Sequence, residues 1–389
     1  MKAIINGELI IPNSDGKLQL AENKVILFDE KIDKIISNEE FQSINKDSLE
    51  KVVDAGGKYV SPGFVNIHIH GCVGRDTMDC DLHALKEMAD FQGTTGVTAF
   101  LPTTMTYDLP RIYRAMEVVK EGQKYNGGAR ILGANMEGPF ISAKYKGAQA
   151  EESICQAEYR FIEKYKDIIK LITIAPETLP KKSDFIKKCQ QAGIVVSIGH
   201  TAASYACAYE AIKKDRLTHI THLFNAMTGF HHREPGVVGA AMDTDVYCEI
   251  IVDNIHCAPA AQRIVYRLKG LERIALITDS MRACGLGDGE SELGGQRVFV
   301  KNQRATLADG TIAGSILTMD RAIYNYAANL NIPVWQAVES ATMTPARALG
   351  LDHIVGSLSP GKYADMVIFD ERVNIAMTFR GGKVVFSRQ

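Results

Sequence analysis

Eight short apolar runs alternate with helical stretches between about residues 57 and 355, and this alternation limits the folds that the chain can adopt. Stretches with helical periodicity, such as DLPRIYRAMEVVKEGQKY, separate the runs. A repeated strand–helix unit predicts a parallel sheet covered by helices. Eight such units predict a closed (β/α)8 barrel, which is an α/β fold. The runs are 59–70, 97–103, 129–138, 169–177, 193–200, 217–225, 247–256 and 273–280.

An open, doubly wound sheet is the alternative for such an alternation. That fold typically places a GxGxxG phosphate-binding turn directly after a strand. None of the eight runs is followed by this pattern. The closed barrel is therefore the favoured prediction.

The two ends of the chain have a different character from the middle. Residues 1 to about 55 contain short alternating runs, LQLAENKVILFD and KIDKIIS, and the carboxyl end repeats this pattern in GKYADMVIFDE and NIAMTFRGGKVVF. Such runs, broken by Asn, Asp and Gly, predict small antiparallel strands. We expect both ends, 1–56 and 357–389, to form one small β-domain beside a barrel at 57–356.

Charge and composition restrict the partners that the protein can have. The formal net charge is -2, from 44 basic and 46 acidic side chains, so no global field attracts nucleic acid or an anionic membrane. The amino terminus lacks the continuous apolar segment of a secretory signal, and no apolar run approaches the roughly 20 residues that cross a bilayer. Eight cysteines are scattered without a CxxC pair, which favours reduced thiols. We expect a cytoplasmic protein with a small-molecule partner.

Side chains that can bind metal stand at the ends of the apolar runs, where barrel enzymes place their active sites. Two of them are separated by a single residue on the first run, so they share one face of the strand. Four imidazoles and two carboxylates suit zinc or a similar divalent ion. A single histidine at a strand end is usually structural, but six such residues at successive ends predict a metal site. They are His68, His70, Glu137, His200, His222 and Asp279.

Two further groups near these positions are predicted to stay outside the ligand set. His219 precedes His222 by three residues on one strand, so we expect its side chain to face the opposite way. Cys72 and Cys80 are close to the rim, where we expect free thiols rather than metal-bound thiolates.

The predicted site favours hydrolysis. A divalent ion lowers the pKa of bound water to about 7 and polarises a carbonyl group, which suits cleavage of an amide or related bond. A base must take a proton from the water and return it to the leaving amine. Asp279, alone at the end of the last run, is the predicted base, with an ordinary ligand role as the alternative.

Several motifs resemble those of the amidohydrolase superfamily over essentially the whole chain. They are PGFVNIHIHG, the TDS of the last run and GSLSPGKYADMVIF. A narrower set resembles the N-acetylglucosamine-6-phosphate deacetylases: MEGPF, SIGHT, THLFNAM followed by REPG, DNIH and GSILTM. The resemblance implies a barrel with a small β-sandwich formed by both chain ends. It also implies release of acetate from the 2-acetamido group of the sugar phosphate, leaving glucosamine 6-phosphate.

The same resemblance assigns roles to the predicted ligands. Glu137, His200 and His222 match the family's central metal ligands, and Asp279 matches its general acid/base. His68 and His70 match the pair found in members that bind a second ion, in which case Glu137 would bridge. The resemblance therefore implies one or two divalent ions per subunit. The mixed imidazole and carboxylate donors predict zinc first, with iron or manganese as alternatives. Many superfamily members use a carboxylated lysine as the bridge, so Glu137 in that role disfavours a dihydroorotase-like enzyme.

The resemblance also implies a phosphate-binding region. Asn225, Ala226 and His256 match residues around the phosphate, and Arg233 matches an arginine contributed by a neighbouring subunit, which implies a homodimer. The forked guanidinium of arginine suits phosphate. Gln149, in KGAQ, matches part of a substrate loop.

Three other functions remain open at this point. Nothing in the sequence indicates how the 4-hydroxyl is recognised, so the galactosamine epimer is an alternative substrate. A deaminase acting on a ring C–N bond uses similar metal chemistry. A non-catalytic barrel is the third alternative, although such proteins usually lose their ligands and this chain has all of them.

Overall fold

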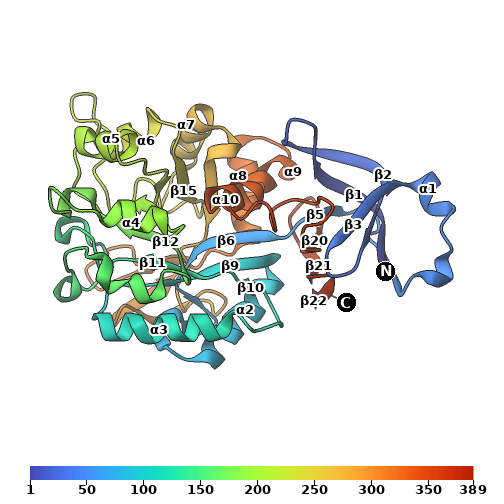
Figure 1. Cartoon of the computed structure of the whole chain (residues 1–389), viewed down its shortest axis with the longest axis horizontal. Helices are drawn as coiled ribbons and strands as arrows, with labels where there is room; N and C mark the ends of the chain where they lie inside the picture. The colour runs from blue at the N-terminus through green and yellow to red at the C-terminus, as the bar shows by residue number, and fades with distance from the viewer. Residues whose placement is uncertain (389) are drawn as a thin grey trace.

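Two lobes make up residues 1–388, the part of the chain that the computed structural model describes (Figure 1). The larger lobe contains the all-parallel sheet and most of the helices, whereas the sheet of the smaller lobe is mixed. The smaller lobe is built from strands of both chain ends, and both termini lie on it.

Eight parallel strands surround the centre of the larger lobe, and each barrel strand pairs with the next barrel strand along the chain, beginning with β6 and β9. Between the last strand and the first, Asp279 N donates to His68 O over 2.9 Å and His70 N donates to Ser280 O over 2.9 Å. These bonds complete the ring, so the predicted (β/α)8 barrel is confirmed. The strands are β6 Phe64–Ile69, β9 Val97–Thr104, β11 Ala134–Glu137, β12 Ile169–Ile174, β13 Val195–Ile198, β14 His219–Ile220, β15 Tyr247–Ile251 and β16 Ile274–Ile277.

The first predicted run, 59–70, is divided between the two lobes. Its first part is β5, Tyr59–Pro62, which pairs with strands of the small lobe, and only β6 belongs to the barrel. Gly63 lies at the crossing, where a Cβ atom would come within 2.0 Å of Thr98 Oγ1. Only glycine fits there, so the chain passes between the sheets at this residue.

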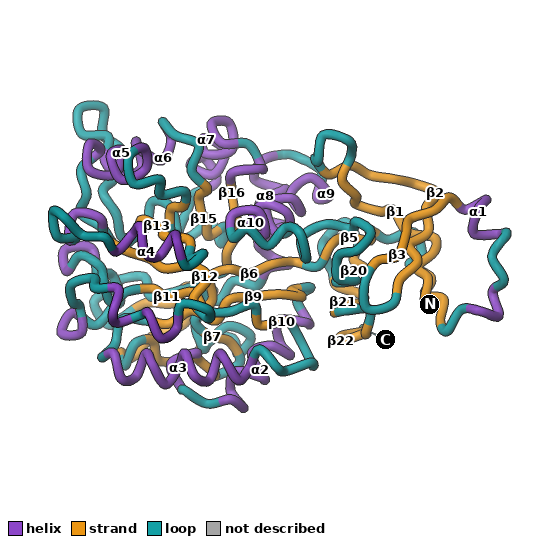
Figure 2. Tube along the Cα trace, viewed as in Figure 1, coloured by secondary structure: helices purple, strands orange, loops and turns teal. Residues whose placement is uncertain are grey.

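Helices lie outside the barrel strands (Figure 2). In α3 the Asp108 side chain caps the helix by accepting from Arg111 N, and the residues Ile112, Ala115, Met116 and Val119 form its buried face. This helix matches the predicted stretch 108–125. The helices are α1 Asn38–Gln42 in the small lobe, and α2 Leu82–Thr94, α3 Leu109–Gly122, α4 Phe185–Gln191, α5 Tyr205–Lys213, α6 Gly236–Met242, α7 Pro259–Lys269, α8 Met319–Leu330, α9 Val334–Ala337 and α10 Met343–Ala348.

Hydroxyl groups replace apolar side chains in part of the barrel interior. Thr221 Oγ1 lies 2.9 Å from Thr173 Oγ1 and 2.6 Å from Ser197 Oγ, and all three residues are buried. Because each hydroxyl has a partner, this layer satisfies its own hydrogen bonds. It provides polar surroundings close to the ends of the strands.

The strands of the small lobe form one hydrogen-bonded sheet in the order β22-β21-β20-β5-β1-β2-β3, with β4 paired to β1. Phe28 in β2 and Phe379 in β21 are four strands apart, yet their ring centroids are 5.9 Å apart. A flat sheet would separate them by roughly 19 Å, at about 4.8 Å per strand, so the sheet curls over its own apolar core as a sandwich does. Its strands are β1 Lys2–Pro12, β2 Leu18–Phe28, β3 Ile32–Ser37, β4 Lys51–Asp54, β5 Tyr59–Pro62, β20 Met366–Phe369, β21 Ile375–Arg380 and β22 Lys383–Ser387.

The two chain ends therefore pair with each other, as the sequence predicts. Because β5 belongs to their sheet, that sheet extends beyond residue 56 into the range predicted for the barrel. The division into a small domain, 1–56 with 357–389, and a barrel domain, 57–356, stays a prediction.

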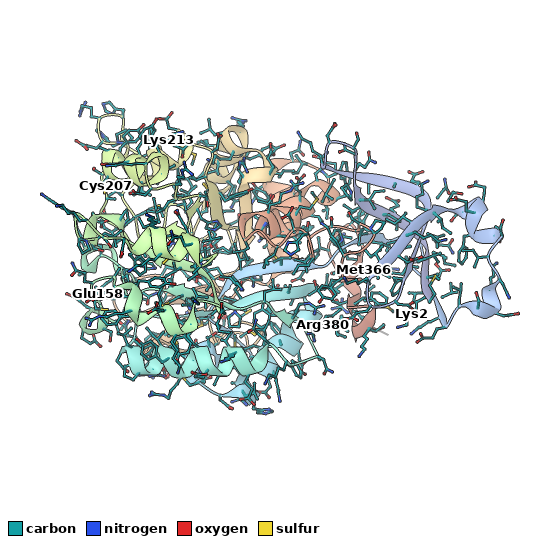
Figure 3. The ribbon with its side chains drawn as sticks, viewed as in Figure 1. Lys2, Glu158, Cys207, Lys213, Met366 and Arg380 are labelled. Atoms are coloured by element: carbon teal, nitrogen blue, oxygen red, sulfur yellow. The ribbon has the colours of Figure 1, made fainter. Side chains whose placement is uncertain are left out.

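Basic side chains connect the lobes. Arg380, labelled with Met366 where the lobes meet in Figure 3, donates from Nη1 to Gly127 O over 2.8 Å. The Arg130 guanidinium lies 3.8 Å from the centre of the Tyr363 ring. These contacts fix the orientation of the small lobe against the barrel.

Three shorter sheets or strands are additional to the eight barrel strands. An antiparallel sheet follows β16, a two-stranded hairpin follows β6, and β10 precedes β11. Within residues 1–388 no helix combines the length and apolar character that a membrane crossing needs. The strands are β7 Gly71–Cys72, β8 Arg75–Asp76, β10 Arg130–Ile131, β17 Gly289–Leu293, β18 Gln296–Lys301 and β19 Arg304–Thr306.

Candidate metal centre

The six predicted ligands come together at the carboxyl ends of the barrel strands. They belong to β6, β11 and the segments that follow β6, β13, β14 and β16. All six are buried, with Asp279 the most exposed at 9%. The residues are His68, His70, Glu137, His200, His222 and Asp279.

Three of these residues adopt a left-handed backbone conformation that residues other than glycine rarely adopt. The φ angles are +47° at His200, +27° at His222 and +46° at Asp279. Each residue stands two positions after its strand ends. A left-handed backbone at a residue other than glycine costs about 1–3 kcal/mol and is concentrated at functional sites. The fold therefore holds these side chains in place at an energetic cost.

Glu137 lies at the centre of a first ligand group. Its Oε1 is 2.9 Å from His222 Nε2 and 3.1 Å from His200 Nε2. The two Nε2 atoms are themselves 3.1 Å apart. The three side chains offer one carboxylate oxygen and two imidazole nitrogens close enough to share one metal ion.

A second ligand group shares Glu137 with the first. Glu137 Oε2 is 3.2 Å from His70 Nε2, and Glu137 Oε1 is 3.4 Å from His68 Nε2. Asp279 Oδ1 is 3.3 Å from His70 Nε2 and 3.5 Å from His68 Nε2. The two groups thus meet at one carboxylate, as a bridging Glu137 requires.

The chemistry of the donors fits a divalent cation. His68 Nε2 is buried, and among residues 1–388 it has no hydrogen-bond partner. A buried polar atom without a partner costs about 1–3 kcal/mol, which a cation between the two groups would relieve. Mixed imidazole and carboxylate donors suit zinc, iron and manganese.

Opposite charges in the cluster shift the pKa values of its members. Burial lowers the pKa of His70, but hydrogen bonds to Asp279 and Glu137 outweigh it and raise that pKa to about 10. Burial raises the pKa of the Glu137 carboxyl, but the neighbouring imidazoles, His200 and His68 first, outweigh it and hold that pKa well below its usual range. The carboxylates therefore stay ionised and stabilise positive charge beside them. A bound divalent ion would provide that positive charge in place of protonated imidazoles.

The outer nitrogens of two ligand rings face backbone carbonyls. His200 Nδ1 lies 3.0 Å from Tyr145 O, and His70 Nδ1 lies 3.3 Å from Thr103 O. A ring that donates its Nδ1 hydrogen to a carbonyl presents the Nε2 lone pair to the centre. The backbone thereby sets the orientation of both rings.

One buried carboxylate at the site was not foreseen from the sequence. Glu249, in β15, places Oε2 2.9 Å from His68 Nδ1 and is fully buried. It lies inside the run YCEIIV rather than at its end. An acidic residue within an otherwise apolar, buried strand is the signal that could have identified it.

The position of His219 differs from its prediction. It is absent from both ligand groups, but its side chain does not face away from the barrel interior. Its Nε2 lies 3.1 Å from Glu249 Oε1, and the backbone N of His222 donates to the other Glu249 oxygen over 3.2 Å. The prediction assumes that His219 and His222 lie on one strand, where side chains three residues apart face opposite ways. It fails because β14 ends at Ile220, and His222 lies beyond it in a left-handed conformation.

A cavity of about 280 Å³ opens onto the ligands. Of the predicted substrate-binding residues, Gln149, Asn225, Ala226 and His256 line it. Arg233 does not line it, and its exposed side chain donates to His232 Nε2 over 2.7 Å. The cavity therefore brings together every predicted substrate residue except the arginine assigned to a neighbouring subunit.

Three of these lining residues already have partners, and Asn225 Nδ2 donates to His222 O and Leu223 O over 3.3 Å each. Gln149 accepts from Thr106 N over 2.6 Å and donates to Glu137 Oε2 over 2.7 Å. His256 Nδ1 lies 2.7 Å from Asp253 Oδ2. Gln149 thus orients the central carboxylate, and Asp253 orients the imidazole of His256.

A larger hollow of about 540 Å³ lies on the surface beside α4 and α5. It is lined by lysines and other polar residues together with apolar residues such as Leu179 and Ile186, and neither ligand group borders it. The smaller cavity is the better candidate for catalysis because buried ligands and strained backbone meet there.

Comparisons with known proteins find similar sequences over most of the chain. Residues 59–385 match the model of the amidohydrolase family. The chain is 38% identical over 334 residues to the N-acetylglucosamine-6-phosphate deacetylase of Bacillus subtilis (strain 168), covering 84% of each protein. It is 32% identical over 339 residues to the N-acetylgalactosamine-6-phosphate deacetylase of Escherichia coli O157:H7, covering 86% of this chain and 89% of that relative.

The fold also resembles a solved structure along its whole length. The crystal structure of N-acetylglucosamine-6-phosphate deacetylase from Pasteurella multocida superposes with a TM-score of 0.91 at 28% identity, covering 98% of this chain and 99% of the other.

Proposed function

The chain belongs to the amidohydrolase family, and we propose that it hydrolyses the 2-acetamido group of N-acetyl-D-glucosamine 6-phosphate to acetate and D-glucosamine 6-phosphate. The observation that carries the proposal is the meeting of both ligand groups at Glu137 beside the cavity. The named relative from Bacillus subtilis supports the substrate.

We propose that Glu137, His200 and His222 hold one divalent ion and that His68 and His70, with Glu137, hold a second. Zinc is the first choice, and iron or manganese are alternatives that the donors also suit. Such an ion supplies Lewis-acid chemistry, polarising the amide carbonyl and making water a better nucleophile at neutral pH.

Asp279 is the proposed general base and acid. It lines the cavity, and its Oδ1 lies 3.3 Å from His70 Nε2. In the proposed reaction it takes a proton from the attacking water and then gives that proton to the nitrogen as the C–N bond breaks. The amine and acetic acid are formed, and proton transfer between them gives the ammonium group and acetate, so atoms and charge balance.

Phosphate recognition is assigned to Asn225, Ala226 and His256 on the cavity wall. Arg233 is proposed to complete this region from the partner subunit of a homodimer. Its exclusion from the cavity of its own chain supports an action in trans. Gln149 is proposed to contact substrate, in addition to orienting Glu137.

The proposed compartment is the cytoplasm. All eight cysteines are free thiols, which supports a reducing environment.

Acetate release from N-acetylglucosamine 6-phosphate by metal-loaded protein tests the proposal. Because one relative is named for the galactosamine epimer, the same assay with N-acetylgalactosamine 6-phosphate decides between the two substrates. We expect the higher kcat/KM on the glucosamine compound. Absence of acetate with both compounds at full metal loading would refute the proposal, and ammonia release from a ring substrate would identify a deaminase instead.

A further inference from the structure

Glu249 is a charged residue in the interior of the barrel, away from the substrate cavity. It is the third residue of β15 and is fully buried. It is not among the residues that line the cavity at the metal groups. A buried carboxylate is costly unless it is hydrogen-bonded, so its presence in an otherwise apolar strand calls for a physical reason.

Three groups surround the Glu249 carboxylate. Oε2 lies 2.9 Å from His68 Nδ1 and accepts from His222 N over 3.2 Å. Oε1 lies 3.1 Å from His219 Nε2. Both oxygens are thus engaged, and the only ligand side chain among these partners is His68.

The contact sets the state of the His68 ring. A carboxylate next to Nδ1 keeps the hydrogen on that nitrogen and leaves the Nε2 lone pair free. Nε2 is the buried atom without a hydrogen-bond partner within residues 1–388, and it lies 3.4 Å from Glu137 Oε1. The ring is therefore fixed with its free electron pair directed at the second ligand group.

The other ligand rings lack such a partner. Nδ1 of His200 and of His70 each face a backbone carbonyl, and Nδ1 of His222 has no hydrogen-bond partner within residues 1–388. A carboxylate strengthens a ring as a metal donor more than a neutral carbonyl does, because it stabilises positive charge on the imidazole. The first group thus has no equivalent of Glu249.

We infer that Glu249 and His219 form a positioning pair that makes the second ion site competent to bind. Glu249 holds His68 in the donor orientation, and His219 holds Glu249. The inference rests on the proposed metal-dependent function, but it concerns ion occupancy rather than substrate.

Metal stoichiometry tests the inference without any substrate. Wild-type protein and the Glu249→Gln variant are loaded with Mn²⁺ and dialysed, and bound metal is measured by elemental analysis and by electron paramagnetic resonance. We expect two ions with a spin-coupled spectrum in the wild type, and one ion with an isolated-Mn²⁺ spectrum in the variant. Second-ion affinity should fall roughly 10–100-fold, the usual effect of losing such a partner.

A second pair of variants, at His219, tests the inference independently of whether Glu249→Gln folds. His219→Gln keeps a donor close to the position of the imidazole Nε2 and should retain both ions, whereas His219→Leu should lose the second. Lys269→Met, which removes another buried charged group but contacts no ligand, is the stability control and should keep two ions.

Three results would overturn the inference: equal second-ion affinity in wild type and Glu249→Gln, loss of both ions together, or a wild type that binds one ion only. Acetate release by the wild type is measured separately. A failed stoichiometry with intact hydrolysis would reject the positioning pair and leave the proposed function standing.

Discussion

The Nε2 atoms of His200 and His222 lie 3.1 Å apart, and both approach the same oxygen of Glu137. Two ring nitrogens so close together cannot both direct a hydrogen at that oxygen without crowding each other. A shared cation satisfies both lone pairs and the carboxylate at once. This relationship, more than any one residue, connects the barrel to metal-dependent chemistry.

Metal removal is expected to abolish acetate release and leave the protein folded. The barrel has an extensive apolar core that does not depend on the ligands, so only the binding contribution to stability is lost. At a free metal concentration one hundred times Kd this contribution is about 2.7 kcal/mol. Urea unfolding with and without chelator, followed by reloading with zinc, measures both effects. Full activity after exhaustive chelation would contradict the metal assignment.

The Asp279→Asn variant is expected to lose roughly 10²–10⁴-fold in kcat, the usual contribution of a general acid–base group. Asparagine has nearly the same shape but cannot accept the proton. Bound metal at Glu137, His200 and His222 should persist, since Asp279 belongs to neither ligand group. Steady-state kinetics with metal analysis on the same sample separate these effects. A near-normal kcat would disprove the proton-transfer role.

The positions of the ligands could be predicted because each ligand can be recognised from the residues next to it in the sequence. A histidine or acid at the end of a buried apolar run is detectable from the run alone, as for Glu137 at the end of β11. The parallel order of the strands then places these ends on one rim.

Glu249 could not be assigned in this way because its role depends on distant partners. His68 and His219 are 181 and 30 residues away from it, and the orientation of His219 depends on where β14 ends. The division of the first run is a similar case. It depends on the close approach of Gly63 to Thr98. This contact joins segments that are distant in the sequence, so the residues around Gly63 alone do not predict it.

The Gln149→Met variant separates two roles for Gln149. Methionine is similar in size but cannot donate to Glu137 Oε2 or accept from Thr106 N. If Gln149 orients the central carboxylate, metal affinity should fall roughly 10–100-fold. Titration with a competing chelator measures this affinity, and KM for the sugar phosphate is determined at saturating metal. A raised KM with unchanged metal affinity would assign Gln149 to substrate contact alone.

Arg233 is expected to act across a dimer interface. The Arg233→Ala variant should raise KM for the sugar phosphate, because a guanidinium–phosphate contact is lost. Mixing it with Asp279→Asn protein, followed by subunit exchange, should restore activity. In the mixed dimer one site contains an intact Asp279 and receives Arg233 from its neighbour. No recovery, with mixed dimers demonstrated by mass spectrometry, would place Arg233 in its own subunit's site or outside catalysis.

Lys269 is expected to give the protein a distinctive dependence of stability on pH. Its buried ammonium donates to Ala241 O over 2.8 Å and to Thr244 O, so it ties α7 to the end of α6. Burial lowers the pKa of Lys269 and outweighs the opposing effects of Cys248 and Asp245, and Arg273 lowers it further.

The folded state thus binds fewer protons than the unfolded state between this lowered pKa and 10.5, and the free energy of unfolding rises with pH in that window. Lys269→Met lacks this contribution and leaves two carbonyls unpaired, which costs about 1–3 kcal/mol at neutral pH. Urea unfolding of both proteins from pH 7 to 10 should show the gap widening as pH rises. A gap that stays constant or narrows would mean that Lys269 keeps its ordinary pKa in the folded protein.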